Sequence, residues 1–220
     1  MQELTQIFKK QGQEFVNDLF NDYLVVTEKI SGSSFSFQKD KDLSFFKGSG
    51  QQRINLIDRT LMIYYEPAIN YITRVTQTVT DIPQDWRFCF EYFVHNEPGV
   101  IKYDNLPKNN LVLTHIQIIG PNGKIAKIIE DPRVINDWAQ KLMVTPLLPI
   151  FKGYLNTDQK AKIKNFISIP IEDQEEVFGT TSFVSYLISI LNPSLSKSLL
   201  HDDLIKPIDS IIFKFYRSGN

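Results

Sequence analysis

The segment WRFCFEYFV, residues 86 to 94, constrains the fold more than any other stretch of the chain. Its side chains alternate at the period of two that is typical of a β-strand, in which successive residues point to opposite faces. One face carries large apolar side chains, namely Phe88, Phe90, Tyr92 and Val94. The other face carries Arg87, Cys89, Glu91 and Phe93. The pattern predicts a strand whose first face belongs to an aromatic core.

Similar patterns predict the other elements. Alternating or β-branched runs indicate strands at residues 23–28, 33–38, 43–47, 111–119 and 208–217. Apolar residues at helical spacing indicate helices at 3–20, 58–79 and 131–143, and a mostly helical stretch at 157–206. Pro67 is expected to start a second helix or to kink the first. Because strands come in hairpins and helices lie between groups of strands, we expect an α+β fold with an antiparallel sheet core.

Composition sets wide limits on function. The 220 residues are 42% hydrophobic, and we expect one domain over residues 1–220. With 24 basic and 25 acidic residues the formal net charge is −1. This charge does not indicate a nucleic-acid partner, but it is compatible with a local basic groove. Cys89 is the single cysteine, so no intramolecular disulfide can form. We find neither a signal peptide nor a membrane span and expect a monomer in the cytoplasm.

Four charged residues on predicted strands suggest a chemical site. Lys29 follows the strand 23–28 and precedes a Gly/Ser-rich turn, and Glu91 lies among aromatic residues, where an unpaired carboxylate is costly. Asp209 and Lys214 flank the start of the last strand. Strict alternation would put these two on opposite faces, and a bulge at the entry would bring them together. Two carboxylates and two lysines on one sheet can form a site for phosphate and magnesium.

The order of these residues resembles the nucleotidyltransferase core of the ATP-dependent ligases, especially RNA ligases and phage-type ligase-like proteins. EKISGS, residues 28–33, is similar to the family's nucleophile motif, Lys-x-Asp-Gly, often preceded by Glu. FEYF matches a later strand that carries a Glu, here Glu91. PIDSIIFKF stands where the family has a Glu-Gly-x-Val-x-Lys-like motif, with Asp209 for the Glu and Lys214 for the lysine.

A further segment, FKGSGQQRINLIDRTL, looks like the place where the family has a basic residue after the first hairpin. Its candidates are Lys47, Arg53 and Arg59, of which we take Lys47 and Arg53 as nucleotide-binding. The resemblance runs from about residue 22 to the end of the chain. It implies the antiparallel-sheet adenylation domain of the ATP-grasp-like DNA and RNA ligase type.

The resemblance implies covalent phosphoryl transfer. Lys29 would attack the α-phosphate of ATP, pyrophosphate would leave and a lysyl-AMP would remain. Magnesium would be held by Glu91 and Asp209, and Lys214 would hold the α-phosphate. Glu28 would accept a hydrogen bond from the adenine amine. The AMP would then pass to a nucleic-acid 5′-phosphate end, RNA in preference to DNA, in a ligation or repair reaction, with no membrane partner.

Two departures from the family pattern keep other functions open. Ser31 replaces the family's Asp, and Asp209-Ser210 replaces Glu-Gly. The family's last motif, a lysine pair, should come after residue 216, so we expect a chain that is truncated before this motif or lacks it. One alternative is a capping-type guanylyltransferase. The other is a nucleotide- or nucleic-acid-binding homologue that has lost catalysis.

Overall fold

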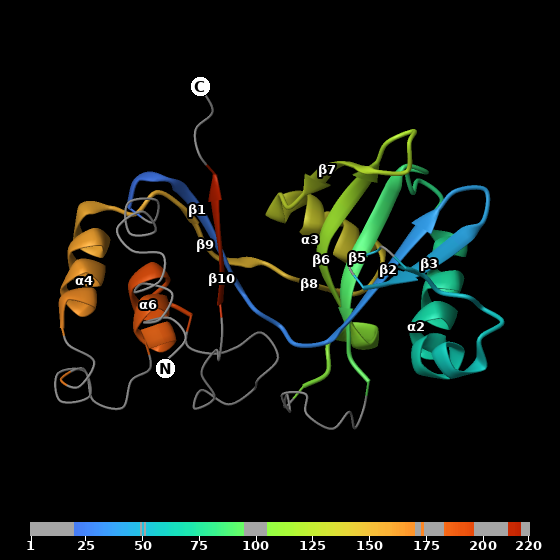
Figure 1. The fold of residues 1–220 in the computed structure, drawn as a ribbon, viewed down its shortest axis with the longest axis horizontal. Helices are drawn as coiled ribbons and strands as arrows, with labels where there is room; N and C mark the ends of the chain where they lie inside the picture. Colours follow the sequence, from blue (N-terminus) through green and yellow to red (C-terminus); the bar gives the residue numbers. More distant parts are fainter. Residues whose placement is uncertain are drawn as a thin grey trace. The chain divides into compact units, whose positions relative to one another are not determined.

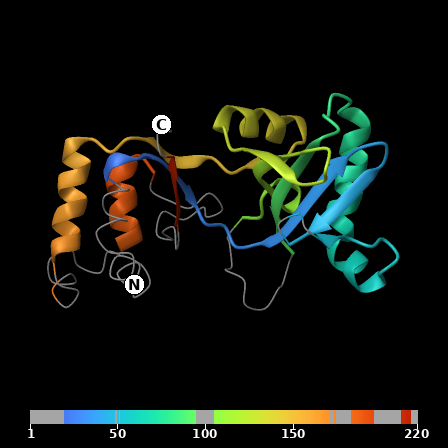
Figure 2. The same ribbon diagram turned by 45° about the horizontal axis from the view of Figure 1, so that its top comes forward.

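The computed structural model describes residues 20–48, 50, 52–94, 105–169, 173, 183–195 and 211–216. The chain divides into two compact units, one formed by residues 1–29 with 149–220 and the other by residues 30–148. Figures 1 and 2 show the helices and strands of both. The single domain expected over residues 1–220 stays a prediction, and each unit is described by itself.

The larger unit, residues 30–148, is built on a seven-stranded sheet (Figure 1). Its strands are β2 (Ser33–Lys39), β3 (Leu43–Lys47), β4 (Gln52–Arg53), β5 (Trp86–Tyr92), β6 (Leu111–Ile119), β7 (Ile125–Ile129) and β8 (Thr145–Pro146). The order is β4-β3-β2-β5-β6-β7, with every neighbouring pair antiparallel, and β8 pairs in parallel with β6. The strands predicted at 33–38, 43–47, 86–94 and 111–119 are confirmed, with small changes at their ends.

Two helices cover the aromatic face of this sheet and close its core. They are α2 (Arg59–Thr78) and α3 (Pro132–Lys141), and a short 3-10 turn, η1 (Lys108–Asn110), precedes β6. The core joins Phe residues of β2 and β5 with side chains of both helices, among them Phe37, Phe88, Ile72 and Trp138. The rings of Phe37 and Phe88 stack at 5.1 Å between centroids. The alternation in WRFCFEYFV is explained by this packing, because one face of the strand is buried under the two helices and the other is not.

The helix α2 runs through Pro67 without interruption, so the proline does not start a second helix. A proline inside a helix removes one backbone hydrogen bond and pushes away the carbonyl one turn earlier. Here Pro67 lies on the exposed side of α2, where water can meet that carbonyl. The buried side, with Tyr65, Ile69 and Ile72, carries the helical period and holds the helix on the sheet.

The smaller unit contains a three-stranded antiparallel sheet in the order β10-β1-β9. Its strands are β1 (Tyr23–Glu28), β9 (Pro149–Gly153) and β10 (Ile211–Tyr216). Leu24 and Val26 of β1 pack against α4 (Thr157–Ser168) and α6 (Phe183–Leu191). The helix α4 begins at a capping box formed by Asn156 and Gln159. The strand predicted at 23–28 and the helical character of 157–206 are confirmed in the described residues, whereas the helix predicted at 3–20 lies almost wholly outside them.

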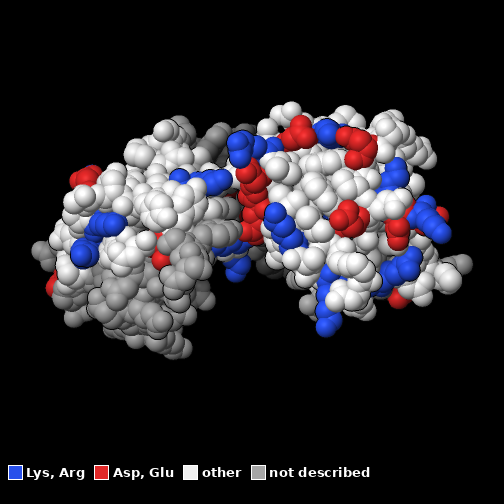
Figure 3. Space-filling view, turned by 90° about the horizontal axis from the view of Figure 1, so that it is seen from above, with Lys and Arg blue, Asp and Glu red and all other residues white. Residues whose placement is uncertain are grey.

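The predicted α+β class with antiparallel sheets is thus confirmed. No helix among the described residues is both long and apolar enough to cross a bilayer. Figure 3 shows Lys and Arg interspersed with Asp and Glu on the larger unit.

Candidate functional site

The segment between β1 and β2 carries the predicted nucleophile. The strand β1 ends at Glu28, and Lys29 follows with an exposed side chain. Ile30 is buried, and β2 begins at Ser33. The exposed Lys29 side chain can therefore reach a ligand. This arrangement suits a nucleophile, although a solvated surface lysine would have it as well.

Gly32 joins this segment to the strand that carries Glu91. The backbone N–H of Gly32 donates a hydrogen bond to Glu91 Oε2 at 3.2 Å. A Cβ atom at Gly32 would lie 3.0 Å from the carbonyl oxygen of Tyr92 and 3.2 Å from the Cβ of Glu91. Only glycine fits without a shift of β5, because a backbone oxygen cannot turn aside as a side chain can. Gly32 is therefore in direct contact with the strand that carries Glu91.

A second contact fixes the same turn from the other side. The Ser33 hydroxyl hydrogen-bonds the Tyr64 hydroxyl of α2. The Tyr64 ring in turn meets the Tyr92 ring edge to face, at 6.1 Å between centroids. The sequence pattern did not single out Tyr64, and no local signal could have done so, because its partner lies 31 residues away. Side chains from α2 and β5 thus hold the turn that follows Lys29.

The Glu91 carboxyl is held partly out of water. Burial raises its pKa to about 7, and the hydrogen bond from the Gly32 N–H lowers the pKa by a smaller amount. We expected this carboxylate to need a cation, a metal or a set of donors. The donor in the described structure is the Gly32 amide, and one amide does not offset the cost of burial. Near neutral pH the group is therefore poised between its charged and neutral forms.

Glu28 and Lys214 lie on opposite faces of the small sheet. Lys214 of β10 pairs with Val25 of β1, so these two side chains share one face. Glu28 is three positions further along β1 and shares the face of Leu24 and Val26, which packs on the helices. Glu28 is 6% exposed. A role of this carboxylate in binding adenine therefore requires a buried contact rather than a surface one.

Lys47 and Arg53 also lie on opposite faces, in the larger unit. Lys47 pairs with Phe35 of β2 and shares the aromatic face of the sheet. Arg53 pairs with Phe46 and shares the face of Cys89 and therefore of Glu91. Of the two, Arg53 is the one on the side of the sheet that carries Glu91.

The predicted magnesium ligands are described only in part. Asp209 and the entry to the last strand lie outside the described residues, as does the side chain of Arg59. The described part of the chain contains no group of three or more His, Cys, Asp or Glu side chains that could hold a metal ion. Glu91 is therefore the one predicted ligand whose surroundings are known.

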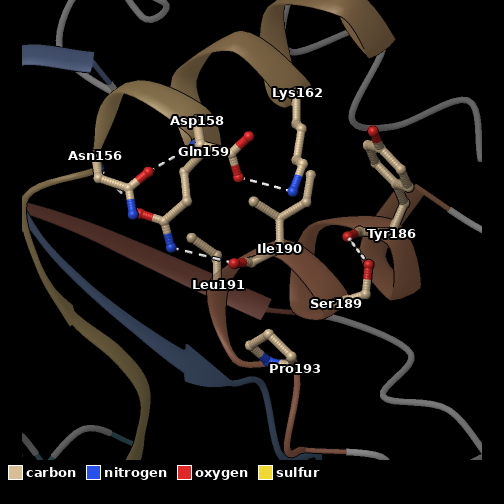
Figure 4. A pocket seen from close by; sticks show the side chains of 9 residues that line it. All are labelled: Asn156, Asp158, Gln159, Lys162, Tyr186, Ser189, Ile190, Leu191 and Pro193. Atoms are coloured by element: carbon tan, nitrogen blue, oxygen red, sulfur yellow. Dashed lines mark hydrogen bonds and ion pairs between the residues drawn. The ribbon is translucent and has the colours of Figure 1, made fainter.

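A pocket of about 470 Å³ lies between α4 and α6, away from all of these residues in the sequence (Figure 4). Its polar groups already bond one another, since Lys162 pairs with Asp158 at 2.7 Å. The amide nitrogen of Gln159 also donates to the carbonyl of Ile190 at 3.1 Å. With its charges paired, the pocket offers little that would select a ligand.

The sequence comparisons name no relative: the chain matches no family model and no curated protein sequence. Function is therefore inferred from the residues of the turn after Lys29 and from their partners.

Proposed function

We propose that the protein is an ATP-dependent nucleotidyltransferase of the polynucleotide ligase type, which forms a covalent lysyl-AMP at Lys29 and acts on RNA ends in preference to DNA ends. The observation that carries this proposal is the hydrogen bond from the Gly32 N–H to Glu91. It ties the segment of the expected nucleophile to the expected acidic strand, 59 residues later in the chain. Two motifs whose order alone suggested the family are thereby in contact. The ligase-type adenylation fold belongs to the same proposal.

In the proposed reaction the Lys29 amine gives up a proton and its lone pair attacks the α-phosphorus of ATP. A nitrogen–phosphorus bond forms, the bond from the α-phosphorus to the bridging oxygen breaks, and pyrophosphate leaves with the electron pair. The AMP then passes to a 5′-phosphate end, and a 3′-hydroxyl displaces it to join the strands. The exposed position of the Lys29 side chain leaves its amine open to the α-phosphate.

The other residues keep the roles that the resemblance implies. Glu28 accepts from the adenine amine, Lys214 neutralises the α-phosphate, and Lys47 and Arg53 assist nucleotide binding. Magnesium enters with the ATP phosphates, since proteins hold this ion through one or two carboxylates plus substrate phosphates. Glu91 is the described carboxylate for this purpose, and Asp209 is the second one in the proposal.

Intact-mass spectrometry tests the proposal. The protein is first treated with pyrophosphate to remove any bound AMP and is then incubated with ATP and magnesium. We expect a gain of one AMP in the wild type and in Lys127→Ala, and none in Lys29→Ala. Lys127 is a matched control because it is also an exposed lysine, on the edge strand β7.

The outcomes separate the candidate functions. No gain in the wild type would refute nucleotidyl transfer and favour a binding protein without catalysis. A gain that persists in Lys29→Ala would refute the choice of nucleophile. A gain with GTP but not with ATP would favour the capping-type guanylyltransferase.

A further inference from the structure

A polar face lies on the seven-stranded sheet, on the side opposite the aromatic core. We define it by side chains that the strand register puts on one side of β2, β4, β5 and β6, namely Ser36, Gln38, Arg53, Arg87, His115 and Gln117. Each central strand of a two-layer sheet would ordinarily leave such residues in water. Here Ser36 is 1% exposed and Gln117 is 3% exposed. Polar side chains this deeply buried need partners.

Arg87 lies at the middle of the polar face and is fixed in place. Its Nη1 donates to the carbonyl oxygen of Gly50 at 2.6 Å, and its Nη2 donates to Gln38 Oε1 at 3.2 Å. The guanidinium lies over the ring of Phe46, 3.9 Å from the centroid. Gly50 has a φ of +79°, and a Cβ there would lie 3.1 Å from the Arg87 Cδ, so glycine permits this close approach. The guanidinium is thus oriented before any ligand arrives.

The charge of Arg87 is not balanced within the described residues. A guanidinium has five N–H groups, and Arg87 uses two of them in the hydrogen bonds described. Its Nε is buried and has no hydrogen-bond partner. No ion pair joins Arg87 to a carboxylate in the part of the chain that the structure describes. Burial lowers its pKa, which reflects the cost of holding this cation away from water.

Two neighbours on the polar face are also unsatisfied. The Ser36 hydroxyl and the Gln117 Oε1 are buried without a hydrogen-bond partner. Gln117 pairs directly with Arg87, and Ser36 lies one strand away, opposite Cys89. On the outer side, the exposed Arg53 pairs with Phe46, the residue under the Arg87 guanidinium. Arg87 contacts the Phe46 ring, and the register puts Arg53 and Ser36 beside Phe46 on the neighbouring strands.

We propose that Arg87 and Arg53 bind a phosphate group of a ligand on the polar face, beside the Phe46 ring. A planar guanidinium with unused N–H groups matches the geometry of phosphate oxygens, and two of them balance its charge. The Gln117 oxygen is an acceptor, so it fits a water bound beside the phosphate and not a phosphate oxygen.

The position of this site in the unit suggests two sources of the phosphate. Arg87 lies four residues from Glu91 on β5, a separation of roughly 13 Å along a strand, and on the same face. A triphosphate tail or the backbone of a nucleic-acid strand bound near Glu91 could both extend this far. The inference that a phosphate binds here does not depend on the chemistry proposed for Lys29.

Binding measurements on the whole chain test the proposal. Tripolyphosphate and a 5′-phosphorylated RNA oligonucleotide serve as probes. Each is titrated at constant ionic strength, and binding is measured as the rise in the thermal unfolding temperature of the protein. We expect Arg87→Gln and Arg53→Gln each to weaken binding by about tenfold or more. Arg133→Gln is the matched control, because it removes the same charge from an exposed arginine of the larger unit. The exposed Arg53 keeps the test decisive if Arg87→Gln does not fold.

Each outcome decides the question. Weaker binding in the two variants but not in Arg133→Gln supports the site. An equal loss in all three variants, or no binding of either probe by the wild type, overturns it. Binding of tripolyphosphate assigns the site to the nucleotide, and binding of the oligonucleotide alone assigns it to a nucleic-acid strand. An absent AMP adduct with intact phosphate binding would refute the proposed function and leave this site standing.

Discussion

Gly32→Ala tests the contact on which the proposed function depends. The added methyl group would lie 3.0 Å from the Tyr92 carbonyl oxygen and 3.2 Å from the Glu91 Cβ, so either the turn or β5 has to move. Overpacking of this kind costs about 1–3 kcal/mol. The shift also lengthens the hydrogen bond from residue 32 to Glu91, which contributes about 1 kcal/mol more. Relative to a glycine-to-alanine change that makes no such contacts, we expect the larger unit to lose about 2–4 kcal/mol of unfolding free energy.

A second glycine of the same unit serves as the control. At Gly120 a Cβ would meet its nearest atom at 3.4 Å, which is ordinary contact. Ala for Gly also restricts the unfolded chain, and this gain of about 0.4–1 kcal/mol applies to both variants. The difference between Gly32→Ala and Gly120→Ala therefore isolates the contact with β5.

Urea unfolding followed by tryptophan fluorescence is a suitable assay. Both tryptophans, Trp86 and Trp138, belong to the larger unit, so the signal reports the unit that contains Gly32. With a slope of about 2 kcal/mol per molar urea, the expected loss lowers the midpoint by about 1–2 M. The rate of AMP adduct formation should fall as well. Equal midpoints for Gly32→Ala and Gly120→Ala, with equal adduct rates, would refute the reasoning.

Two further predictions concern the same turn. Tyr64→Phe should slow adduct formation several-fold, because it removes the hydroxyl that holds Ser33. Tyr71→Phe is the control on the same helix: it loses a hydrogen bond to the Leu142 carbonyl and should cost a similar stability of about 1 kcal/mol without slowing the reaction. Equal rates for the two variants in single-turnover assays would contradict this. The Glu91 pKa is raised in the folded state, so the metal-free protein should lose stability as pH rises from about 4.5 to about 7, by up to about 2 kcal/mol after allowance for solvent screening. Glu91→Gln should flatten this dependence in urea titrations at several pH values, and a slope unchanged from the wild type would show that another group titrates.

The long helices and strands could be predicted from the sequence, because one buried face sets the spacing of the apolar residues in each of them. The strand at 86–92 and the helix at 59–78 both follow from the spacing of their apolar residues. The short strands β4 and β8, of two residues each, carry no period, and β9 begins at Pro149, a residue that argues against a strand. Such elements form only because a neighbouring strand offers them hydrogen bonds.

The candidate site divides in the same way. Lys29, Gly32 and Glu91 could be proposed as site residues from the order of the motifs, since each is of a residue type that the family motif has at that place. The contact between Ser33 and Tyr64 could not, because it joins a strand to a helix that approach only in the folded chain. The alternation puts Arg87 on the face of Glu91, but its fixed orientation depends on Gln38, which the strand register brings opposite it, and on Gly50, which lies between β3 and β4.

The pairing of β1 with β10 has a consequence for synthesis of the protein. Glu28 faces Ile211, so these strands are separated by roughly 180 residues of chain. The larger unit, in contrast, is one unbroken stretch from residue 30 to residue 148, and all the strands of its sheet lie within that stretch. On the ribosome this stretch can fold while β1 still waits for its last partner strand. The larger unit, which follows Lys29 in the chain, can therefore be folded before β10 has been synthesised to complete the sheet that contains β1.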